Sequence, residues 1–191
     1  VKVQHMFPLR SLDKGISDEE IIHFVTQSTF AGKRYLAQPK LDGSALSLEY
    51  VAGNLHRAAT RGSGERGEDV TLNAKLVANV PLRLNVAIDC HVRGEVVMPL
   101  AVFEEKYRDI SPNPRNLCSG ALRQKHGDGK GEASDLVFQA YDVKFPNNAP
   151  DATNDSELLS WLESAGIKPA PWTIFESQSP QLEMIKFTQE W

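Results

Sequence analysis

A regular alternation of residues in the first half of the chain constrains its fold more than any other feature. Large apolar side chains alternate with small or polar ones in the segment Ala45, Leu46, Ser47, Leu48, Glu49 and Tyr50. This is the period of a strand with one buried face. The segment Ala52-Gly53-Asn54 that follows has turn chemistry. Residues 44–61 are therefore predicted to form a strand hairpin.

Other local patterns predict further helices and strands around this hairpin. Ser17 and Glu20 have capping-box spacing, and Asn113-Pro114 has the form of a cap followed by a first-turn proline. Helices are predicted from Ser17, over 70–80, from Pro99, over 115–124, over 156–165 and from Ser179 to Trp191, and strands over 86–98 and 136–143. The stretches 61–69 and 126–132 are predicted to be loops. Strands in hairpin order with helices inserted between them predict an α+β fold.

Composition excludes several classes of protein. The chain has 191 residues, of which 41% are hydrophobic, and a formal net charge of −4, so it is long enough for a packed core and is not predicted to be disordered. No run of apolar residues is long enough to span a membrane, and the N-terminal segment lacks a signal-peptide pattern. The two cysteines are too few for a four-cysteine zinc site and fit a reducing compartment. We therefore expect a cytoplasmic protein without a membrane partner.

The charge is divided unevenly along the chain. Residues 1–131 hold 18 basic and 15 acidic side chains, a net of +3, whereas residues 132–191 hold 3 and 10, a net of −7. The overall acidity therefore does not exclude a nucleic-acid partner, although +3 is too small to predict tight binding.

Lys40-Leu41-Asp42-Gly43 is the first candidate for chemistry. A lysine can act as a nucleophile once its amine is neutral, and Asp42 projects to the same side of an extended segment. Gly43 would allow a ligand to approach the backbone. By itself, the tetrapeptide is more typical of an exposed lysine and aspartate before a turn.

Three more groups of charged residues have both a functional and a structural interpretation. Arg61 opens a glycine-rich stretch and could grip a phosphate, or could belong to an ordinary polar loop. Glu95 in Arg93-Gly94-Glu95 could bind a ribose or a metal, or could pair with Arg93 on an edge strand. Arg115 and Arg123 on one predicted helix could bind phosphates or simply be solvated. Tyr141 could stack on a base or pack in the core.

Taken together and in this order, the motifs resemble the adenylation (nucleotidyltransferase) domain of bacterial-type NAD-dependent DNA ligases. The resemblance extends over most of the chain. The matching pieces are His5-x-x-Pro8 with Ser11-Leu12, Pro39-Lys40-Leu41-Asp42-Gly43, Thr60-Arg61-Gly62, Gly67-Glu68-Asp69-Val70-Thr71 with Asn73, Val92-Arg93-Gly94-Glu95-Val96, Asn113-Pro114-Arg115-Asn116 through Arg123 and Gln124, and Phe138 to Tyr141.

The resemblance implies an antiparallel-sheet nucleotidyltransferase fold, shared with mRNA capping enzymes and ATP-grasp-like, with residues 1–191 as an adenylation domain. It implies that Lys40 attacks the α-phosphate of NAD, releases nicotinamide mononucleotide and carries AMP, and that Mg²⁺ neutralises the phosphate charge. AMP would then pass to a 5′-phosphate in nicked double-stranded DNA, with the protein acting as a monomer.

Each matched position also acquires an implied role. Ser11, Leu12 and Gln38 would surround the adenine, on which Tyr141 would stack. Asp42 would belong to the nucleotide site, and Arg61 and Glu95 would hold the ribose and phosphate. Arg115 and Arg123 would grip the DNA 5′-phosphate and the adenylate.

The sequence departs from the family pattern at two positions. Gln38 stands where most members have Glu, and Ser63 stands where the main family has Asp, as in divergent DNA ligase B-like or phage-like members. The family pattern also continues with two lysine motifs, which residues 1–191 lack together with the accessory domains. A non-catalytic module that retains the fold and binds nucleic-acid ends is the alternative, as is a relative that uses ATP or GTP.

Overall fold

The computed structural model describes residues 1–9, 13–26, 34–125, 131–147 and 149–175. The chain forms two compact units, of which unit 1 comprises residues 1–10 and 41–170. Unit 2 comprises residues 11–40 and 171–191. Each unit is described by itself below.

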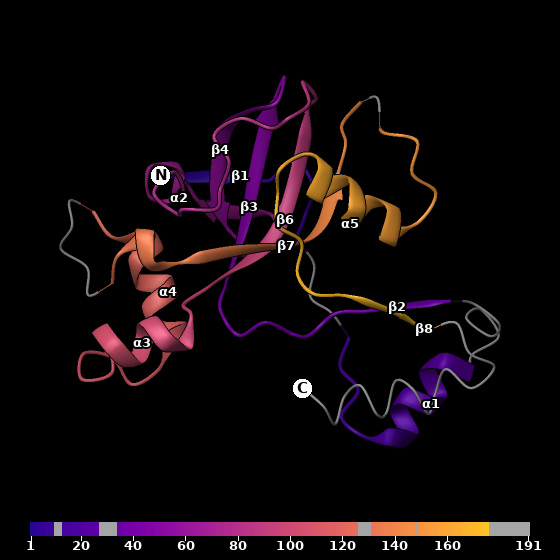
Figure 1. The fold of residues 1–191 in the computed structure, drawn as a ribbon, viewed down its shortest axis with the longest axis horizontal. Helices are drawn as coiled ribbons and strands as arrows, with labels where there is room; N and C mark the ends of the chain where they lie inside the picture. The colour runs from indigo at the N-terminus through magenta and orange to yellow at the C-terminus, as the bar shows by residue number, and fades with distance from the viewer. Residues whose placement is uncertain (10–12, 27–33, 126–130, 148, 176–191) are drawn as a thin grey trace. The chain divides into compact units, whose positions relative to one another are not determined.

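Unit 1 is built on a four-stranded antiparallel sheet in the order β4-β3-β6-β7 (Figure 1). Its strands are β3 (Ser44–Val51), β4 (Asn54–Thr60), β6 (Cys90–Val97) and β7 (Val137–Lys144). The predicted hairpin is confirmed, because β3 and β4 pair directly and the chain reverses at Ala52 and Gly53, which have φ values of 47° and 77°. The sequence therefore predicted the centre of the fold, and the antiparallel mixture of strands and helices agrees with the predicted α+β class.

The sheet has two faces of opposite character. What we call the apolar face carries side chains that are completely buried, namely Leu46, Leu48, Val92, Val96 and Phe138. The polar face carries the alternate positions, which lie opposite one another in the strand register: Ser47 opposite Arg93, Glu49 opposite His91, and Glu95 opposite Gln139. Alternation along a strand explains this division, since successive side chains point to opposite sides of the pleat.

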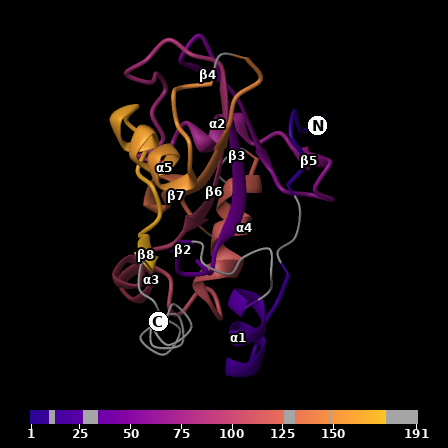
Figure 2. The ribbon, with the colours of Figure 1, turned by 90° about the vertical axis from the view of Figure 1, so that its right-hand side faces the viewer.

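In the described part of unit 1, four helices accompany the sheet: α2 (Thr71–Ala74), α3 (Leu100–Lys106), α4 (Pro114–Arg123) and α5 (Asp155–Ser164). The Asn113 side chain caps α4 by accepting a hydrogen bond from the Asn116 amide at 2.9 Å, as its position before Pro114 predicts. Asn154 caps α5 in the same way. Figure 2 shows α4 beside the lower part of β3, and α4 also contacts β6. A short 3₁₀ turn at Ala133–Asp135 precedes β7.

Two predicted elements are shorter than their patterns indicated. The helix predicted over 70–80 ends at Ala74, because the amides of Leu76 and Val77 bond three residues back instead of four. The strand predicted over 86–98 begins only at Cys90. The preceding segment bonds elsewhere, since Asn85 donates to the Ala165 carbonyl at 3.0 Å and the Ile88 carbonyl accepts from Gly53 at 2.9 Å.

The prediction that 61–69 contains no regular element is wrong at its end. Strand β5 (Arg66–Glu68) pairs antiparallel with β1 (Lys2–Gln4), with Val3 opposite Gly67. Local sequence does not reveal such a pairing, because its two strands are far apart along the chain. The N-terminal segment is thereby fixed along the glycine-rich stretch.

Side chains and loops occupy the hydrogen-bonding groups of the outer strand β7. Asn79 donates to the Phe138 carbonyl at 2.6 Å and accepts from the Phe138 amide at 2.8 Å. Further along the same edge, the Ala140 amide donates to the Lys168 carbonyl and its carbonyl accepts from Ala170. These bonds satisfy backbone groups that an edge strand would otherwise leave open.

Unit 2 contains α1 (Asp18–Thr26) and a two-stranded sheet of β2 (Tyr35–Ala37) and β8 (Thr173–Phe175). The capping box predicted at α1 is present, because the Glu20 amide donates to the Ser17 hydroxyl and Glu20 accepts from the Ser17 amide. Val25, Tyr35 and Phe175 form its small core. The helix predicted from Ser179 to Trp191 and part of the loop predicted over 126–132 lie outside the described residues.

Candidate functional site

Lys40 and Gln38 lie in the segment that follows β2. Lys40 is exposed and is the last residue of unit 2 before the chain enters unit 1 at Leu41. The Gln38 Nε2 atom is buried and has no hydrogen-bond partner among the described residues. A buried donor without a partner is costly, so this amide is available to a ligand acceptor. Ser11 and Leu12 lie outside the described residues.

In unit 1, Asp42 lies beside the N-terminal turn of α4. Its carboxylate is 3.1 Å from the Arg115 guanidinium, in an ion pair whose side chains are 75% and 62% exposed. Beneath them, burial raises the pKa of the Cys118 thiol to about 11, and the nearby carboxylates of Glu95 and Asp42 contribute to the same shift. Asp42 therefore contacts the start of α4, and Glu95 of β6 lies near enough to this helix to influence the Cys118 thiol.

Tyr141 occupies an irregular position in β7. Asp142 pairs with Arg93 and Ala140 with Gly94, so the register skips Tyr141, which makes it the extra residue of a β-bulge. Burial raises the pKa of its phenol to about 12. The charges of Glu95 and Asp142 raise this pKa further, whereas those of Arg93 and Arg61 lower it. The bulge thus brings the Tyr141 ring to the charged residues of the polar face.

The glycine-rich stretch after Arg61 is a tight turn. Gly62 and Gly64 have φ values of 55° and 94°, which favour glycine. The Gly64 amide donates to the Arg61 carbonyl at 3.0 Å, and the Ser63 hydroxyl accepts from the Arg66 amide at 3.2 Å. The Ser63 hydroxyl therefore accepts a hydrogen bond that an aspartate carboxylate could also accept at this position, which explains how the turn accommodates serine.

Arg123 ends α4 and forms an ion pair with Glu68 of β5 at 2.8 Å, with both side chains about half exposed. Asn73 holds this end of the helix, since its amide donates to the carbonyls of Leu122 and Gln124 at 2.8 and 2.9 Å. The structure thus pairs each of the two predicted phosphate arginines with a carboxylate from a separate motif.

Sequence reasoning missed several residues of the polar face. Arg93 donates to Asp142 at 3.1 Å, and β6 is a central strand, so the alternative of an Arg93–Glu95 pair on an edge strand is wrong. Arg93 Nε and Gln139 Oε1 are buried without hydrogen-bond partners among the described residues. The available signal was that polar residues recur at every second position of β6, at His91, Arg93 and Glu95.

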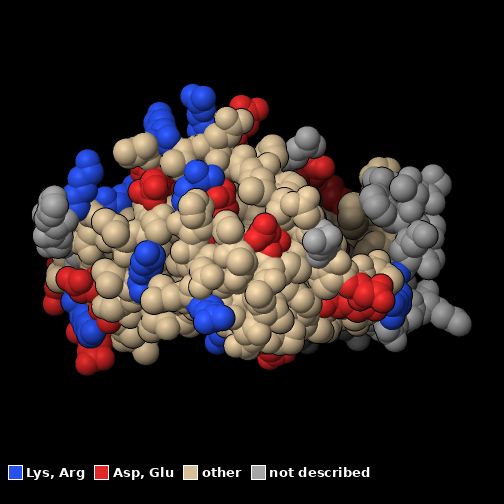
Figure 3. Space-filling view, turned by 90° about the horizontal axis from the view of Figure 1, so that it is seen from above, with Lys and Arg blue, Asp and Glu red and all other residues tan. Residues whose placement is uncertain are grey.

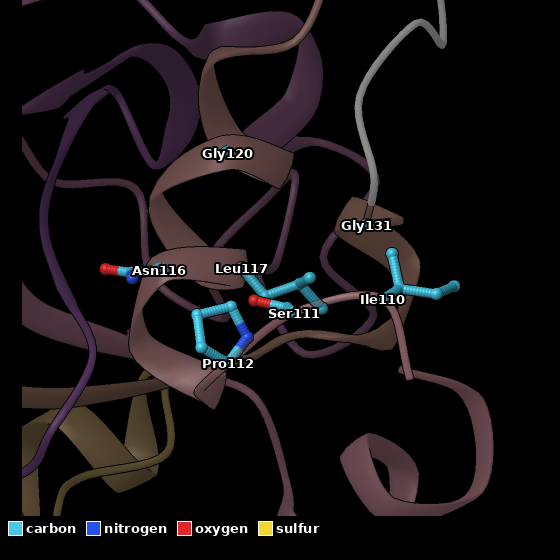
Figure 4. A pocket seen from close by; sticks show the side chains of 7 residues that line it. All are labelled: Ile110, Ser111, Pro112, Asn116, Leu117, Gly120 and Gly131. Atoms are coloured by element: carbon cyan, nitrogen blue, oxygen red, sulfur yellow. The ribbon is translucent and has the colours of Figure 1, made fainter. Parts of the chain in front are cut away.

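Two pockets in the described part of unit 1 lie apart from the predicted site residues. One pocket of about 280 Å³ lies against α4, and in Figure 4 Pro112 and Ser111 face Leu117 across it. Another of about 530 Å³ lies beside Trp161 of α5 and the turn at Ala52. No predicted site residue lines either pocket.

Charged side chains are mixed over the surface. Figure 3 shows Lys and Arg interleaved with Asp and Glu on the described part of one face. Recognition of a phosphate would therefore depend on individually placed arginines more than on a broad basic field.

Two kinds of feature are absent from the described residues. Within the described ranges, no helix has the length and apolar character needed to cross a membrane. The same part of the chain contains no group of three or more His, Cys, Asp or Glu side chains that could hold a metal ion.

Comparison with known proteins shows the family to which this chain belongs. A family model described as the NAD-dependent DNA ligase adenylation domain matches residues 1–191. The chain is 36% identical over 189 residues to a DNA ligase of Leptospira interrogans, covering 97% of this chain and 27% of that protein. It is 40% identical over 192 residues to a DNA ligase of Nitrobacter hamburgensis, covering 89% of this chain and 26% of that protein.

The chain thus spans about a quarter of the length of the curated relatives that it matches. The match to the family model covers the motifs around Lys40, Arg61, Glu95 and Tyr141 as well as α4. On this ground the chain belongs to the NAD-dependent DNA ligase adenylation domain family.

Proposed function

We propose that this chain is the part of an NAD-dependent DNA ligase that activates DNA ends by transferring AMP. The neutral amine of Lys40 attacks the α-phosphorus of NAD, a P–N bond forms, and the bond to nicotinamide mononucleotide breaks as the amine loses its proton. AMP is then passed from Lys40 to the 5′-phosphate at a nick in double-stranded DNA. Residues 1–191 act in this proposal as one adenylation domain of a cytoplasmic, monomeric ligase.

The observation that carries the proposal is the group of charges around Tyr141. The pKa of its phenol is affected by the charges of Glu95 and Arg93, which both lie in β6, and of Arg61, which follows β4. An aromatic ring that is 36% exposed, beside a carboxylate and arginines, suits a purine base with its ribose and phosphate. We assign base stacking to Tyr141, ribose contact to Glu95 and phosphate contact to Arg61.

The contact to the adenine edge is assigned to Gln38, Ser11 and Leu12. The unpartnered Gln38 Nε2 can donate to a ring nitrogen, and Ser11 and Leu12 complete the adenine pocket by the family pattern. A glutamine presents both a donor and an acceptor, so it supports the same edge contact that a glutamate would make as an acceptor.

The DNA side is assigned to α4. The ion pairs of Arg115 and Arg123 are exposed by half or more, and such pairs typically stabilise a protein by only about 0–1 kcal/mol. A phosphate group, which accepts forked bonds from a guanidinium, can therefore displace Asp42 or Glu68 at little cost. This exchange would leave Asp42 free to turn toward the nucleotide.

Magnesium fits the donor set as a phosphate-bound ion. Mg²⁺ usually takes one or two carboxylates together with substrate phosphates and several waters. Asp42 and Glu95, which both lie close enough to Cys118 to raise the pKa of its thiol, could supply those carboxylates. When bound, the ion would neutralise charge on the phosphate.

The test is intact-mass measurement of the full-length protein after incubation with NAD and Mg²⁺. A mass gain of one AMP is expected for the wild type and for Lys75→Ala, a control at an exposed lysine, but not for Lys40→Ala. An adduct that persists in Lys40→Ala would refute the assignment.

Two further results would favour other functions. Salt-sensitive binding of nicked duplex without any adduct would identify a non-catalytic module that binds nucleic-acid ends. An adduct formed from ATP but not from NAD would identify an ATP-using relative.

A further inference from the structure

The N-terminal segment lies along the glycine-rich turn that begins with Arg61. Beyond the β1–β5 pairing, the His5 amide donates to the Glu65 carbonyl and the Leu9 amide donates to the Gly64 carbonyl, both at 2.8 Å. Residues before and after His5 therefore both form backbone hydrogen bonds with this turn and the strand that follows it.

The His5 imidazole joins this turn to the polar face of the sheet. It is only 6% exposed, with Nε2 at 3.2 Å from the Arg61 carbonyl and Nδ1 at 3.3 Å from the Ser47 hydroxyl. A carbonyl can only accept, so Nε2 carries a hydrogen and donates it to the Arg61 carbonyl. The Ser47 hydroxyl donates to the Ala59 carbonyl at 3.2 Å.

Tight packing leaves the imidazole little freedom. A Cβ atom at Gly67 would lie 2.9 Å from His5 Nε2 and 1.7 Å from the Thr60 carbonyl oxygen, so the backbone passes close to the ring. The ring centroid of His91 lies 6.3 Å from that of His5, and Phe7 packs on His91 at 5.8 Å. The donor at Nε2 is thus held at the Arg61 carbonyl.

We infer that His5 is a positioning residue for Arg61. By fixing the Arg61 carbonyl together with the Gly64 amide, His5 sets the position of the backbone that carries the Arg61 side chain. This inference rests on the proposed function, in which Arg61 holds the nucleotide phosphate. The other end of the imidazole, at Ser47, serves only to anchor the ring.

Two amide variants distinguish the contribution of the Nε2 contact from that of the Nδ1 contact. His5→Gln places an amide near the position of Nε2 and can still donate to the Arg61 carbonyl, whereas His5→Asn reaches only the Nδ1 position near Ser47. The full-length protein is assayed for the rate of AMP adduct formation at varied NAD concentration. Matched controls are His56→Gln and His56→Asn at an exposed histidine of β4.

We expect His5→Asn to lower kcat/KM for NAD roughly tenfold, mainly through KM, and His5→Gln to stay within about threefold of the wild type. In the Arg61→Ala background, His5→Asn should cause no further loss, because the two residues act as one unit. Equal losses in the Gln and Asn variants, or losses that add to that of Arg61→Ala, would overturn the inference while leaving the proposed function intact. A wild-type protein that forms no adduct would overturn both.

Discussion

The two faces of the four-stranded sheet are made by the same strands, yet they differ in how their side chains are satisfied. On the apolar face, Leu46, Val92 and Phe138 are fully buried against other apolar groups. On the polar face, Arg93 Nε, Gln139 Oε1 and both ring nitrogens of the fully buried His91 have no hydrogen-bond partners among the described residues. Unpaired buried groups cost stability, so the apolar face stabilises the fold while the polar face retains bonding capacity for a ligand.

The largest expected difference between the faces is in stability. Phe138→Ala should lower the free energy of unfolding by about 3–5 kcal/mol, because it leaves a cavity in the core. Gln139→Ala, one position along on the polar face, should cost about 1 kcal/mol or less, since it also removes the unpartnered oxygen. Urea unfolding measures both values. Equal losses at the two positions would remove the distinction between the faces.

The polar face should also respond to acid through His91. Burial, with the charges of Arg93, His5 and Arg57 nearby, lowers the pKa of His91 from 6.5 to about 4. The unfolded chain therefore takes up a proton at a higher pH than the folded chain. The stability that neutral His91 provides is complete above about pH 6.5 and is lost as the pH falls toward 4, by about 3 kcal/mol in all.

His91→Leu should remove this part of the pH dependence. Urea unfolding at pH 7 and pH 5 should show a smaller loss in the variant than in the wild type. His56→Leu, at an exposed position of β4, serves as the control and should leave the loss unchanged. An identical loss in wild type and His91→Leu would show that His91 does not titrate as a buried group.

A smaller effect is expected from the ion pair of the polar face. Asp142 contacts Arg93 at 3.1 Å and also Lys144 at 3.2 Å, so it retains a cation when Arg93 is removed. Arg93, only 15% exposed, would lose its carboxylate in Asp142→Asn. We expect Asp142→Asn to destabilise by about 1–3 kcal/mol and Arg93→Met by less, as measured by urea unfolding. The reverse order would contradict this asymmetry.

The smallest effect is expected outside the four-stranded sheet, at the exposed ion pair between Arg123 and Glu68. Glu68→Gln should change the free energy of unfolding by less than about 1 kcal/mol, and the change should vanish in high salt. Thermal unfolding at low and high ionic strength measures it. A loss that persists in high salt would show that the pair contributes as much as a buried one.

Sequence patterns predicted those features that depend on neighbouring residues. The alternation at Leu46 and Leu48 predicted the hairpin and its two faces, and Asn113 predicted the start of α4. The bulge at Tyr141 could not be predicted, because it is a property of pairing with β6 and not of β7 alone. The same holds for the pairing of β1 with β5.

For the candidate site, the sequence predicted residues but not the contacts between them. The motif order predicted Asp42, Glu95 and Arg115 as site residues, and the structure pairs Asp42 with Arg115. Nothing in the spacing indicated that Asp42 pairs with Arg115 or that Glu68 pairs with Arg123. His5 was part of a matched motif without a role, since its partners Ser47 and Arg61 are distant along the chain.

The hydrogen bonds of Asn79 to Phe138 have a consequence for association between molecules. An open edge strand offers amides and carbonyls to any other extended chain, which is how sheets of different molecules join and aggregate. Along β7 these groups are occupied by Asn79 and by the backbone of Lys168 and Ala170. On the opposite edge, the Ala58 carbonyl accepts from the Val70 amide. At these positions the sheet cannot grow by adding a strand from a second molecule.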